Sequence, residues 1–564
     1  MATERTISGR RAEVRYLIFA AFCGVAFMLP ALTWGVPLGA DLDAHFRLVQ
    51  PFYDELARGN IMPGWLAESN NGFGDARFRF YPPLMFYLLS GGRWLTGDWY
   101  AGLLLIFTIL SVIGAVGMYM FAKRTITPGW AAAAAAIYCL MPYHAAQFYQ
   151  ASLLLEFTAA AFLPWVFLGL DRTMSDERLS PSSISLTAGA AAAIVLSHVP
   201  TTLTSFIGLA IFTLLLINGK RSVKRLFAAT CALVLGLAIS APFWVKVIAE
   251  LPWVQAGYKV TSDHYLYTNN FALSPFTPTN LNTFFASLIA GLTIGLLFPA
   301  LYFIRDIIRG RKIDDRSIGR PVRAAFVVAL FAVYMTTELS RPVWAAVPKL
   351  PDIQFPHRWL SIAVVAATPA IVVSLAAWTA RIRDRKFRAL HIIFVLPFVL
   401  SLVYGTYELV IDSDFLTRDQ FLARAEANRG GRSFTDWLPP DAAELKDLAH
   451  IEGPADAVGR VIEPIEVGSH SRQFRIADGP AGSVRIRSYY YPLWKAKAVC
   501  GREEVPLATR KAEDGILMVD LPAGECTLDL SFVEPDRTRW SIAASAIGIL
   551  MSFALAFFRK RSMS

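Results

Sequence analysis

Long apolar stretches alternate with short polar connectors along most of this chain. The stretches are roughly 17 to 22 residues long, the length that a helix needs to cross a bilayer. The pattern predicts about twelve spans, at residues 16–35, 101–121, 129–147, 151–170, 183–199, 202–218, 226–248, 284–304, 324–338, 360–379, 390–411 and 538–558. The apolar run from Met85 to Leu95 is too short for a span and is predicted to lie in the membrane interface.

The basic residues gather in segments that fall on one side of the membrane when these spans are counted in order. These segments are Arg10-Arg11 with Arg15, Lys123-Arg124, Lys220-Arg221 with Lys224-Arg225, Arg305 to Arg323, Arg381 to Arg388, and Arg559-Lys560-Arg561. Cytoplasmic loops are enriched in Lys and Arg, so we expect a cytoplasmic N-terminus. The longer segments 36–100, 249–283 and 412–536 then lie outside the cytoplasm, where function should be sought.

The second half of segment 412–536 has the alternation of β-strands. Cys526, Leu528, Leu530 and Phe532 alternate with polar residues, and turn signals separate such runs. We therefore expect an all-α membrane domain (1–411), an external domain (412–536) that ends in a β-sandwich, and a last helix with a basic tail (537–564). The first part, 412–450, is charged and is expected to be helical or irregular. Cys500 and Cys526 either form a disulfide or remain buried thiols.

Composition agrees with a membrane protein and argues against a nucleic-acid partner. The chain is 55% hydrophobic and 17% charged, with a mean hydropathy of +0.43. The net charge of +10 comes from 54 basic and 44 acidic residues. Since the basic residues sit in short loops between spans, no basic face remains for nucleic acid.

An acidic cluster follows the first predicted span directly. If this segment is helical, Asp41 and His45 lie one turn apart on the same face and could act on one substrate group. Asp41 is then a candidate base for an attacking hydroxyl, and His45 would orient it, hold a phosphate or help to bind a metal. Asp43 points elsewhere and is assigned to substrate binding. The alternative is a solvated helix N-terminus, where Asp is favourable.

Polar residues near the external ends of two later spans are further candidates. Glu156 lies in an apolar helix, where a carboxylate is costly unless it faces a cavity or a partner. His144 is close by in sequence and could line the same cavity, although a polar helix end is the ordinary explanation. Arg358 at a helix start could grip a phosphate, with His357 as a weaker helper. Interfacial snorkelling of Arg358, or its pairing with Asp352, stays open as an alternative.

The loop 249–283 carries Glu250, Asp263 and His264, which are possible cation ligands. Hard cations need several converging oxygens, and the spacing here is loose. We therefore assign no metal ligands and expect no cofactor, with a divalent cation as the alternative.

The order of several motifs resembles GT-C-type membrane glycosyltransferases, in particular the bacterial 6-pyruvoyl-tetrahydropterin synthase-related membrane proteins and their YfhO-like relatives. The motifs are Asp41-x-x-x-His45, Gly59 to Trp65, Asn71 to Gly74, Phe78 to Leu84, Glu156-Phe157 before Leu163-Pro164-Trp165, Leu350 to Trp359, and Tyr490 to Trp494 before Leu521 to Gly524. Two positions depart from the pattern: His357 replaces an aromatic residue and Leu493 replaces a glycine. The clustered histidines of a pterin-synthesising zinc enzyme are absent from the sequence.

This resemblance implies a transferase in the bacterial inner membrane. Such an enzyme takes a sugar from a polyprenyl-phosphate carrier and places it on a lipid, glycan or protein acceptor at the external face. The acidic residue after the first span is the usual catalytic base, a role that carries over to Asp41. Tyr81, in the loop motif Phe78 to Leu84, is assigned to substrate binding. Two alternatives remain: a transporter or flippase for lipid-linked intermediates, although no internal repeat is visible, and a non-catalytic envelope-assembly scaffold.

Overall fold

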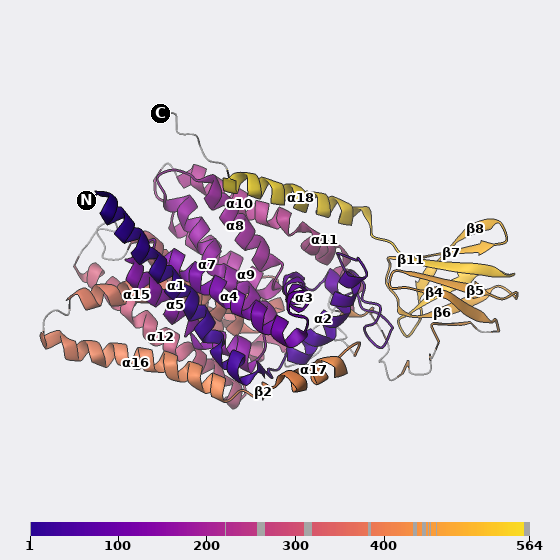
Figure 1. Ribbon diagram of the computed structural model, residues 1–564, viewed down its shortest axis with the longest axis horizontal. Coiled ribbons are helices and arrows are strands. Elements are labelled where there is room, and N and C mark those ends of the chain that lie inside the picture. The colour runs from indigo at the N-terminus through magenta and orange to yellow at the C-terminus, as the bar shows by residue number, and fades with distance from the viewer. Residues whose placement is uncertain are drawn as a thin grey trace.

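A computed structural model shows a helical body with a β domain at one end (Figure 1). It describes residues 2–219, 222–255, 265–309, 319–381, 385–431, 437–440, 442, 447–448, 451, 453–457 and 459–557. The basic residues Lys220-Arg221 and Arg559-Lys560-Arg561, and the proposed cation ligands Asp263 and His264, lie outside these residues.

Eighteen α-helices are found in the described residues. They are α1 (Ala2–Trp34), α2 (Leu42–Ala57), α3 (Leu84–Thr96), α4 (Trp99–Ala122), α5 (Pro128–Cys139), α6 (Pro142–Ala145), α7 (Leu154–Ser175), α8 (Pro181–Val195), α9 (Val199–Leu215), α10 (Ser222–Ile239), α11 (Ala241–Glu250), α12 (Thr279–Ile308), α13 (Arg320–Thr336), α14 (Arg341–Ala346), α15 (Leu360–Arg381), α16 (Arg385–Ile411), α17 (Arg418–Ala427) and α18 (Asp536–Phe557).

Seven of the described helices are long and apolar enough to cross a membrane. Their apolar segments are Arg11–Trp34, Trp99–Ala122, Leu154–Ser175, Ser222–Ile239, Thr279–Arg305, Pro356–Ala380 and Asp536–Phe557. The predicted spans 129–147, 183–199, 202–218 and 324–338 contain helices of at most 17 residues. The span 390–411 lies within the continuous helix α16, whose apolar segment in the described residues is Val395–Ile411. The predicted count of about twelve is therefore not confirmed. The range 226–248 breaks after Ser240, where α11 starts with Ala241-Pro242, and 129–147 breaks before Pro142. Proline cannot donate the backbone hydrogen bond that would continue the preceding helix.

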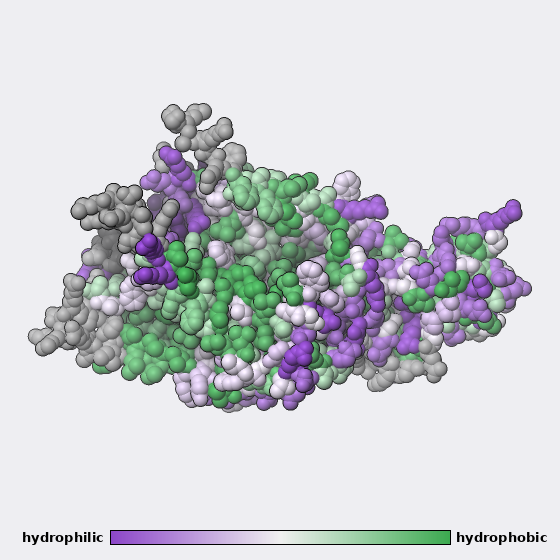
Figure 2. Space-filling view, viewed as in Figure 1, coloured by the Kyte–Doolittle hydropathy of each residue, from purple (hydrophilic) through white to green (hydrophobic). Residues whose placement is uncertain are grey.

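The helical body presents an apolar surface, whereas the β domain is mainly hydrophilic (Figure 2). Large apolar side chains are exposed along the outer helices α16 and α18, for example Leu396, Val403, Leu550 and Phe553. Lipid is the solvent that tolerates such a surface. The beginning of α1 and the end of α18 lie on the side of the body away from the β domain (Figure 1).

The β domain is the predicted sandwich of two antiparallel sheets. One sheet has the order β3-β6-β10-β9 and the other β4-β5-β11-β7-β8. Their bounds are β3 (Ala455–Ala457), β4 (Ile462–Val467), β5 (Ser471–Ile476), β6 (Gly482–Tyr489), β7 (Trp494–Cys500), β8 (Glu503–Leu507), β9 (Thr509–Lys511), β10 (Ile516–Leu521) and β11 (Cys526–Phe532). Alternate residues of both sheets, such as Val484, Val519, Phe474 and Leu528, share one buried core.

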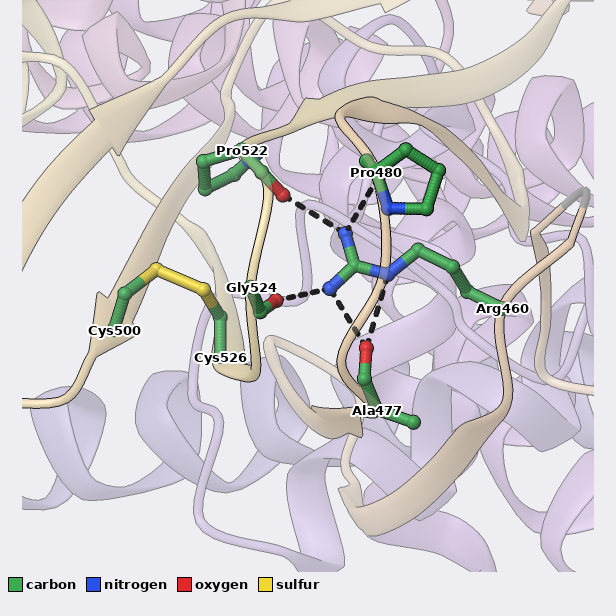
Figure 3. Close-up of a disulfide and its surroundings, with 7 residues drawn as sticks. All are labelled: Arg460, Ala477, Pro480, Cys500, Pro522, Gly524 and Cys526. Atoms are coloured by element: carbon green, nitrogen blue, oxygen red, sulfur yellow. Dashed lines mark hydrogen bonds between the residues drawn. A yellow bond between two sulfur atoms is a disulfide. The ribbon is translucent and has the colours of Figure 1, made fainter.

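A disulfide and the hydrogen bonds of one arginine hold the turns at one end of the sandwich (Figure 3). Cys500 and Cys526 form a disulfide, which decides between the two alternatives left open by the sequence. The Arg460 guanidinium donates to the backbone carbonyls of Ala477 (2.8 Å), Pro522 (2.8 Å) and Gly524. One side chain thus ties the turn after β5 to the turn before β11.

The loop after α2, residues 58–83, joins the helical body to the β domain. Its residues Trp65, Phe73 and Phe80 are buried in the core of the β domain, and the backbone N–H of Tyr489 donates to the carbonyl of Phe73 (2.7 Å). The Trp65 ring lies 5.7 Å from that of Trp494, centroid to centroid. The loop therefore belongs to both parts of the molecule.

A buried ionic cluster lies beside this loop. Arg79, which is 0% exposed, donates to both carboxylate oxygens of Glu250 at the end of α11. It also donates to Glu534 just before α18, at 2.5 and 3.1 Å. Tyr491 of the β domain and Arg537 of α18 donate to Glu250 at 2.7 and 2.8 Å. Burial alone would raise the pKa of Glu534, but its hydrogen bonds with Arg79 and the charges of Arg79 and Lys246 lower this pKa to about 2, so Glu534 stays ionised at neutral pH.

We expect Arg79→Ala to destabilise the protein by about 3–5 kcal/mol, because it leaves the carboxylates of Glu250 and Glu534 without the guanidinium that both accept from. The measurement is the thermal unfolding of purified protein in lipid. Arg510→Ala is the matched control, since Arg510 and its partner Asp520 are 50% and 54% exposed and such pairs contribute little. Equal melting temperatures for the two variants would contradict a supporting role for Arg79.

Candidate active site

Asp41 stands at the N-cap of α2, held in place by the chain that precedes α7. Its backbone N–H donates to the carbonyl of Ala151 (3.1 Å), and Nε2 of His45 donates to the carbonyl of Ser152 (3.0 Å). Asp41 and His45 are one helical turn apart, as predicted. The first turn of α2 is therefore fixed against one short bend of the chain.

That bend has an uncommon backbone. A π-helix covers Ala146–Gln150, and Ser152 then has φ of 48°, in the left-handed region. Ser152 is also 1% exposed, and its Oγ has no hydrogen-bond partner among the described residues. Gly39 packs so closely that an added Cβ would lie 2.4 Å from the backbone nitrogen of Ser152. Such strained backbone persists only where surrounding contacts enforce it, and it is frequent at functional sites.

Glu156, in the first turn of α7, is the centre of a buried hydrogen-bond network. Its Oε1 accepts from Tyr143 OH (2.6 Å), Ser361 Oγ (2.7 Å) and Gln147 Nε2 (3.1 Å). Glu156 is 1% exposed, and its Oε2 has no hydrogen-bond partner among the described residues. The second oxygen is therefore available to a further donor.

Arg358 supplies positive charge to this region. It belongs to the 3₁₀-helix Pro356–Trp359 that leads into α15. Its Nη1 donates to the carbonyl of Ile353 (2.6 Å), and its guanidinium lies 4.8 Å from the centre of the Phe355 ring. Its charge interacts with Glu156, Tyr143, Tyr81 and Asp41. The alternative pairing with Asp352 is not observed, because Asp352 pairs with the exposed Lys349 (3.2 Å).

Two more segments bring Tyr81 and His198 close to Asp41 and Arg358. The N–H of Leu84 donates to the carbonyl of Leu196 (2.8 Å), which joins the loop carrying Tyr81 to the start of α9. Tyr81 interacts electrostatically with both Asp41 and Arg358. His198, at the N-cap of α9, interacts with Arg358 and His45. The sequence prediction missed His198, whose available signal was a polar residue between two apolar helices.

Burial sets the protonation of the two residues on α2. It raises the pKa of Asp41 above its ordinary value, and the Arg358 charge partly offsets this. It also lowers the pKa of His45 to about 4, so His45 is neutral at pH 7. Since Nε2–H donates to a carbonyl, Nδ1 of this neutral ring carries no proton. His45 therefore positions α2 and does not supply a cation for phosphate.

Three other predicted site residues, Asp43, His144 and His357, have their described contacts elsewhere. Asp43 accepts hydrogen bonds from Arg424 (both at 2.7 Å) and joins α2 to α17. Nδ1 of His144 lies 3.2 Å from Oε1 of Gln147, and His144 borders a cavity of about 20 Å³. The ring of His357 stacks on Phe285 with centroids 4.9 Å apart. Asp43 therefore forms an ion pair with Arg424 between two helices, and His144 contacts the side chain of Gln147.

The possible cation ligand Glu250 is occupied by the Arg79 cluster. Among the described residues, no group of three or more His, Cys, Asp or Glu side chains could hold a metal ion.

A family model of the 6-pyruvoyl-tetrahydropterin synthase-related domain, described as a membrane protein, matches residues 78–413. This chain belongs to that family. The matched region contains Tyr81, Glu156, His198 and Arg358 of the candidate site, whereas Asp41 precedes it. No curated protein matches the chain in sequence.

Several solved structures are similar in fold to this family member. A mycobacterial arabinofuranosyltransferase, AftD, is 17% identical with a TM-score of 0.47, and the match covers 70% of this chain and 27% of that one. The Archaeoglobus fulgidus oligosaccharyltransferase is 15% identical with a TM-score of 0.43, covering 75% and 56%. ArnT from Cupriavidus metallidurans, bound to undecaprenyl phosphate, is 15% identical with a TM-score of 0.41, covering 73% and 76%. At such scores, the site residues have to be assigned from this chain itself.

We expect Gly39→Ala to destabilise the protein by about 1–3 kcal/mol, because the new methyl group collides with the backbone of Ser152. Gly91→Ala is the control, since an added Cβ at Gly91 meets nothing within 4 Å. Thermal unfolding of both variants provides the measurement. A neutral Gly39→Ala variant would show that α2 is free to move away from the bend.

Proposed function

We propose that this protein is a membrane glycosyltransferase that moves a sugar from a polyprenyl-phosphate carrier to an acceptor at the external face of the membrane. The observation that carries the proposal is the convergence of Asp41 and Arg358, a carboxylate with a raised pKa and a guanidinium whose charge acts on it. Transfer from a glycosyl phosphate needs these two groups: a base for the acceptor and a cation for the departing phosphate. The order of the sequence motifs, which resembles GT-C enzymes, supports the same reaction.

In the proposed reaction, the Asp41 carboxylate accepts the proton of the acceptor hydroxyl as its oxygen forms a bond to the anomeric carbon of the sugar. The bond between that carbon and the phosphate oxygen breaks, and polyprenyl phosphate leaves with the electron pair. Arg358 binds the phosphate oxygens, where a guanidinium can make two parallel hydrogen bonds. The proton on Asp41 passes to solvent after the acceptor has left.

The remaining groups position these two. Glu156 balances the charge of Arg358 in an apolar surrounding, where an uncompensated guanidinium is costly, and its Oε2 is placed to accept a hydroxyl of the sugar. Tyr81 contacts the substrate beside Asp41. Neutral His45 holds the first turn of α2 through Ser152. No cofactor enters this scheme, and the assay below includes a divalent cation as a variable.

The proposal includes an orientation in the membrane. The basic connectors are cytoplasmic, and the active site and the β domain lie outside the cytoplasm of a bacterial inner membrane. The Cys500–Cys526 disulfide supports this side for the β domain, since disulfides persist in oxidising compartments.

We expect Asp41→Asn to lower the transfer rate by about 10²- to 10⁴-fold, the usual loss on removal of a general base. Purified protein in lipid is incubated with a panel of polyprenyl-phosphate sugars and membrane extract, and released polyprenyl phosphate is followed by mass spectrometry. Asp43→Asn is the matched control, because Asp43 pairs with Arg424. Parallel reactions with EDTA and with added Mg²⁺ test for a divalent cation.

Two results would count against this assignment. Equal turnover by wild type and Asp41→Asn removes Asp41 from the chemistry. If neither protein consumes any donor, a transporter or a scaffold becomes the better explanation.

The acid side of the pH–rate profile reports on Asp41. A base must be deprotonated, so activity falls as the pH drops through the pKa of Asp41, which burial raises above 3.8. Arg358 lowers this pKa, and we expect Arg358→Gln to move the acid limb to higher pH in addition to slowing transfer. A profile of kcat/KM between pH 4 and 8 measures the shift. An acid limb that moves to lower pH would separate Arg358 from Asp41.

A further inference from the structure

The outer face of the five-stranded sheet carries an open groove of about 300 Å³. It lies in the β domain, whose surface is mainly hydrophilic (Figure 2). The residues that line it are Glu466, Ser471, Arg472, Gln473, Lys495, Ala496, Lys497, Asp529, Leu530 and Ser531. We call this feature the sheet groove.

Strand pairing arranges the polar side chains of the sheet groove in two rows. Asp529 of β11 lies opposite Gln473 of β5 on one side and Lys497 of β7 on the other. In the same way, Ser531 lies between Ser471 and Lys495. Residues two apart on a strand point to the same face. Each row therefore crosses three strands, and both rows face the groove.

These rows offer hydrogen-bond donors and acceptors in nearly equal measure. Ammonium and amide groups donate, and carboxylate and hydroxyl oxygens accept. The outward-facing charges are two lysines, Lys495 and Lys497, and two carboxylates, Glu466 and Asp529. Lys497 also donates to Glu504 (3.1 Å), and the neutral amide of Gln473 donates to Asp529 (2.7 Å). No aromatic residue lines the groove. The side chains of the two rows are thus polar and close to neutral in total charge, and strand pairing fixes their spacing.

This chemistry selects among classes of ligand. A protein partner is usually bound through aromatic or aliphatic anchors, whereas the apolar lining residues Ala496 and Leu530 belong to the buried core of the β domain. A polyanion requires an excess of exposed basic side chains, whereas Lys495 and Lys497 are accompanied here by Glu466 and Asp529. The third basic residue of the lining, Arg472, is buried and donates to the carbonyl of Arg487. A neutral sugar chain presents hydroxyl groups that both donate and accept, which matches the mixed rows.

We propose that the sheet groove binds a neutral glycan and that this glycan is part of the acceptor. Its identity as acceptor rests on the proposed function, whereas glycan binding does not. The groove holds one part of a long acceptor while another part reaches the transferase site. Without stacking aromatic rings, the affinity of a single groove is modest, and selectivity comes from the spacing of the two rows.

The test measures binding of neutral oligosaccharides, namely maltoheptaose, cellohexaose and an isomaltose oligomer, to the full chain in lipid nanodiscs. Saturation-transfer NMR detects weak binding, and a titration gives the dissociation constant. Asp529→Ala removes the centre of one row. Asp520→Ala is the matched control, an exposed aspartate on β10 of the opposite sheet that pairs with Arg510.

We expect binding of at least one neutral oligosaccharide, a dissociation constant about tenfold higher for Asp529→Ala, and no change for Asp520→Ala. Absence of binding by all three sugars, or an equal loss in both variants, would overturn the proposal. So would preferential binding of an oligogalacturonate, which is anionic. Asp41→Asn protein should bind as the wild type does, so failure of the transferase assay and failure of glycan binding are read separately.

Discussion

The relative placement of the two parts of this protein depends on one guanidinium, that of Arg79. It lies where the loop after α2, the end of α11, the β domain and the start of α18 meet, and it has two carboxylates as partners. A buried charge is costly by itself, so each partner is needed to keep the others buried. The same loop continues to Tyr81, two residues further on. The cluster therefore fixes the β domain and one edge of the candidate site together.

The candidate active site also contains buried charged groups that need partners, on a smaller scale. Glu156 gives one oxygen to three neutral donors and keeps the other without a partner among the described residues. Arg358 provides the balancing charge and makes only one direct hydrogen bond that is described, to the carbonyl of Ile353. Both residues thus retain hydrogen-bonding capacity in a largely buried environment. Polar groups left incomplete in this way are costly to stability and are typical of sites that await a ligand.

The sequence predicts well what depends on local pattern. The alternation from Cys526 to Phe532 gave a strand, and the long apolar stretches gave helices. Asp41, Glu156 and Arg358 stood out because charge near an apolar helix needs a reason. Contacts between distant segments could not be predicted in this way. Ser152 acquires its role from a backbone bend, and Asp43 pairs with Arg424, 381 positions away. Glu250 was considered as a metal ligand because its partner Arg79 is far away in sequence.

The short ladder between β1 (Val36–Pro37) and β2 (Phe415–Leu416) bears on how the protein is made. The partner of residues just after the first helix is synthesised almost 400 residues later, followed at once by α17, which packs on α2. A nascent chain released before Phe415 would contain Asp41, Glu156 and Arg358 and still lack β2 and α17, the strand and helix that hold β1 and α2. During biosynthesis, the segment that bears Asp41 therefore lacks these partners for most of translation. The order of synthesis keeps the support of the candidate site incomplete until Ala427, the end of α17, has been made.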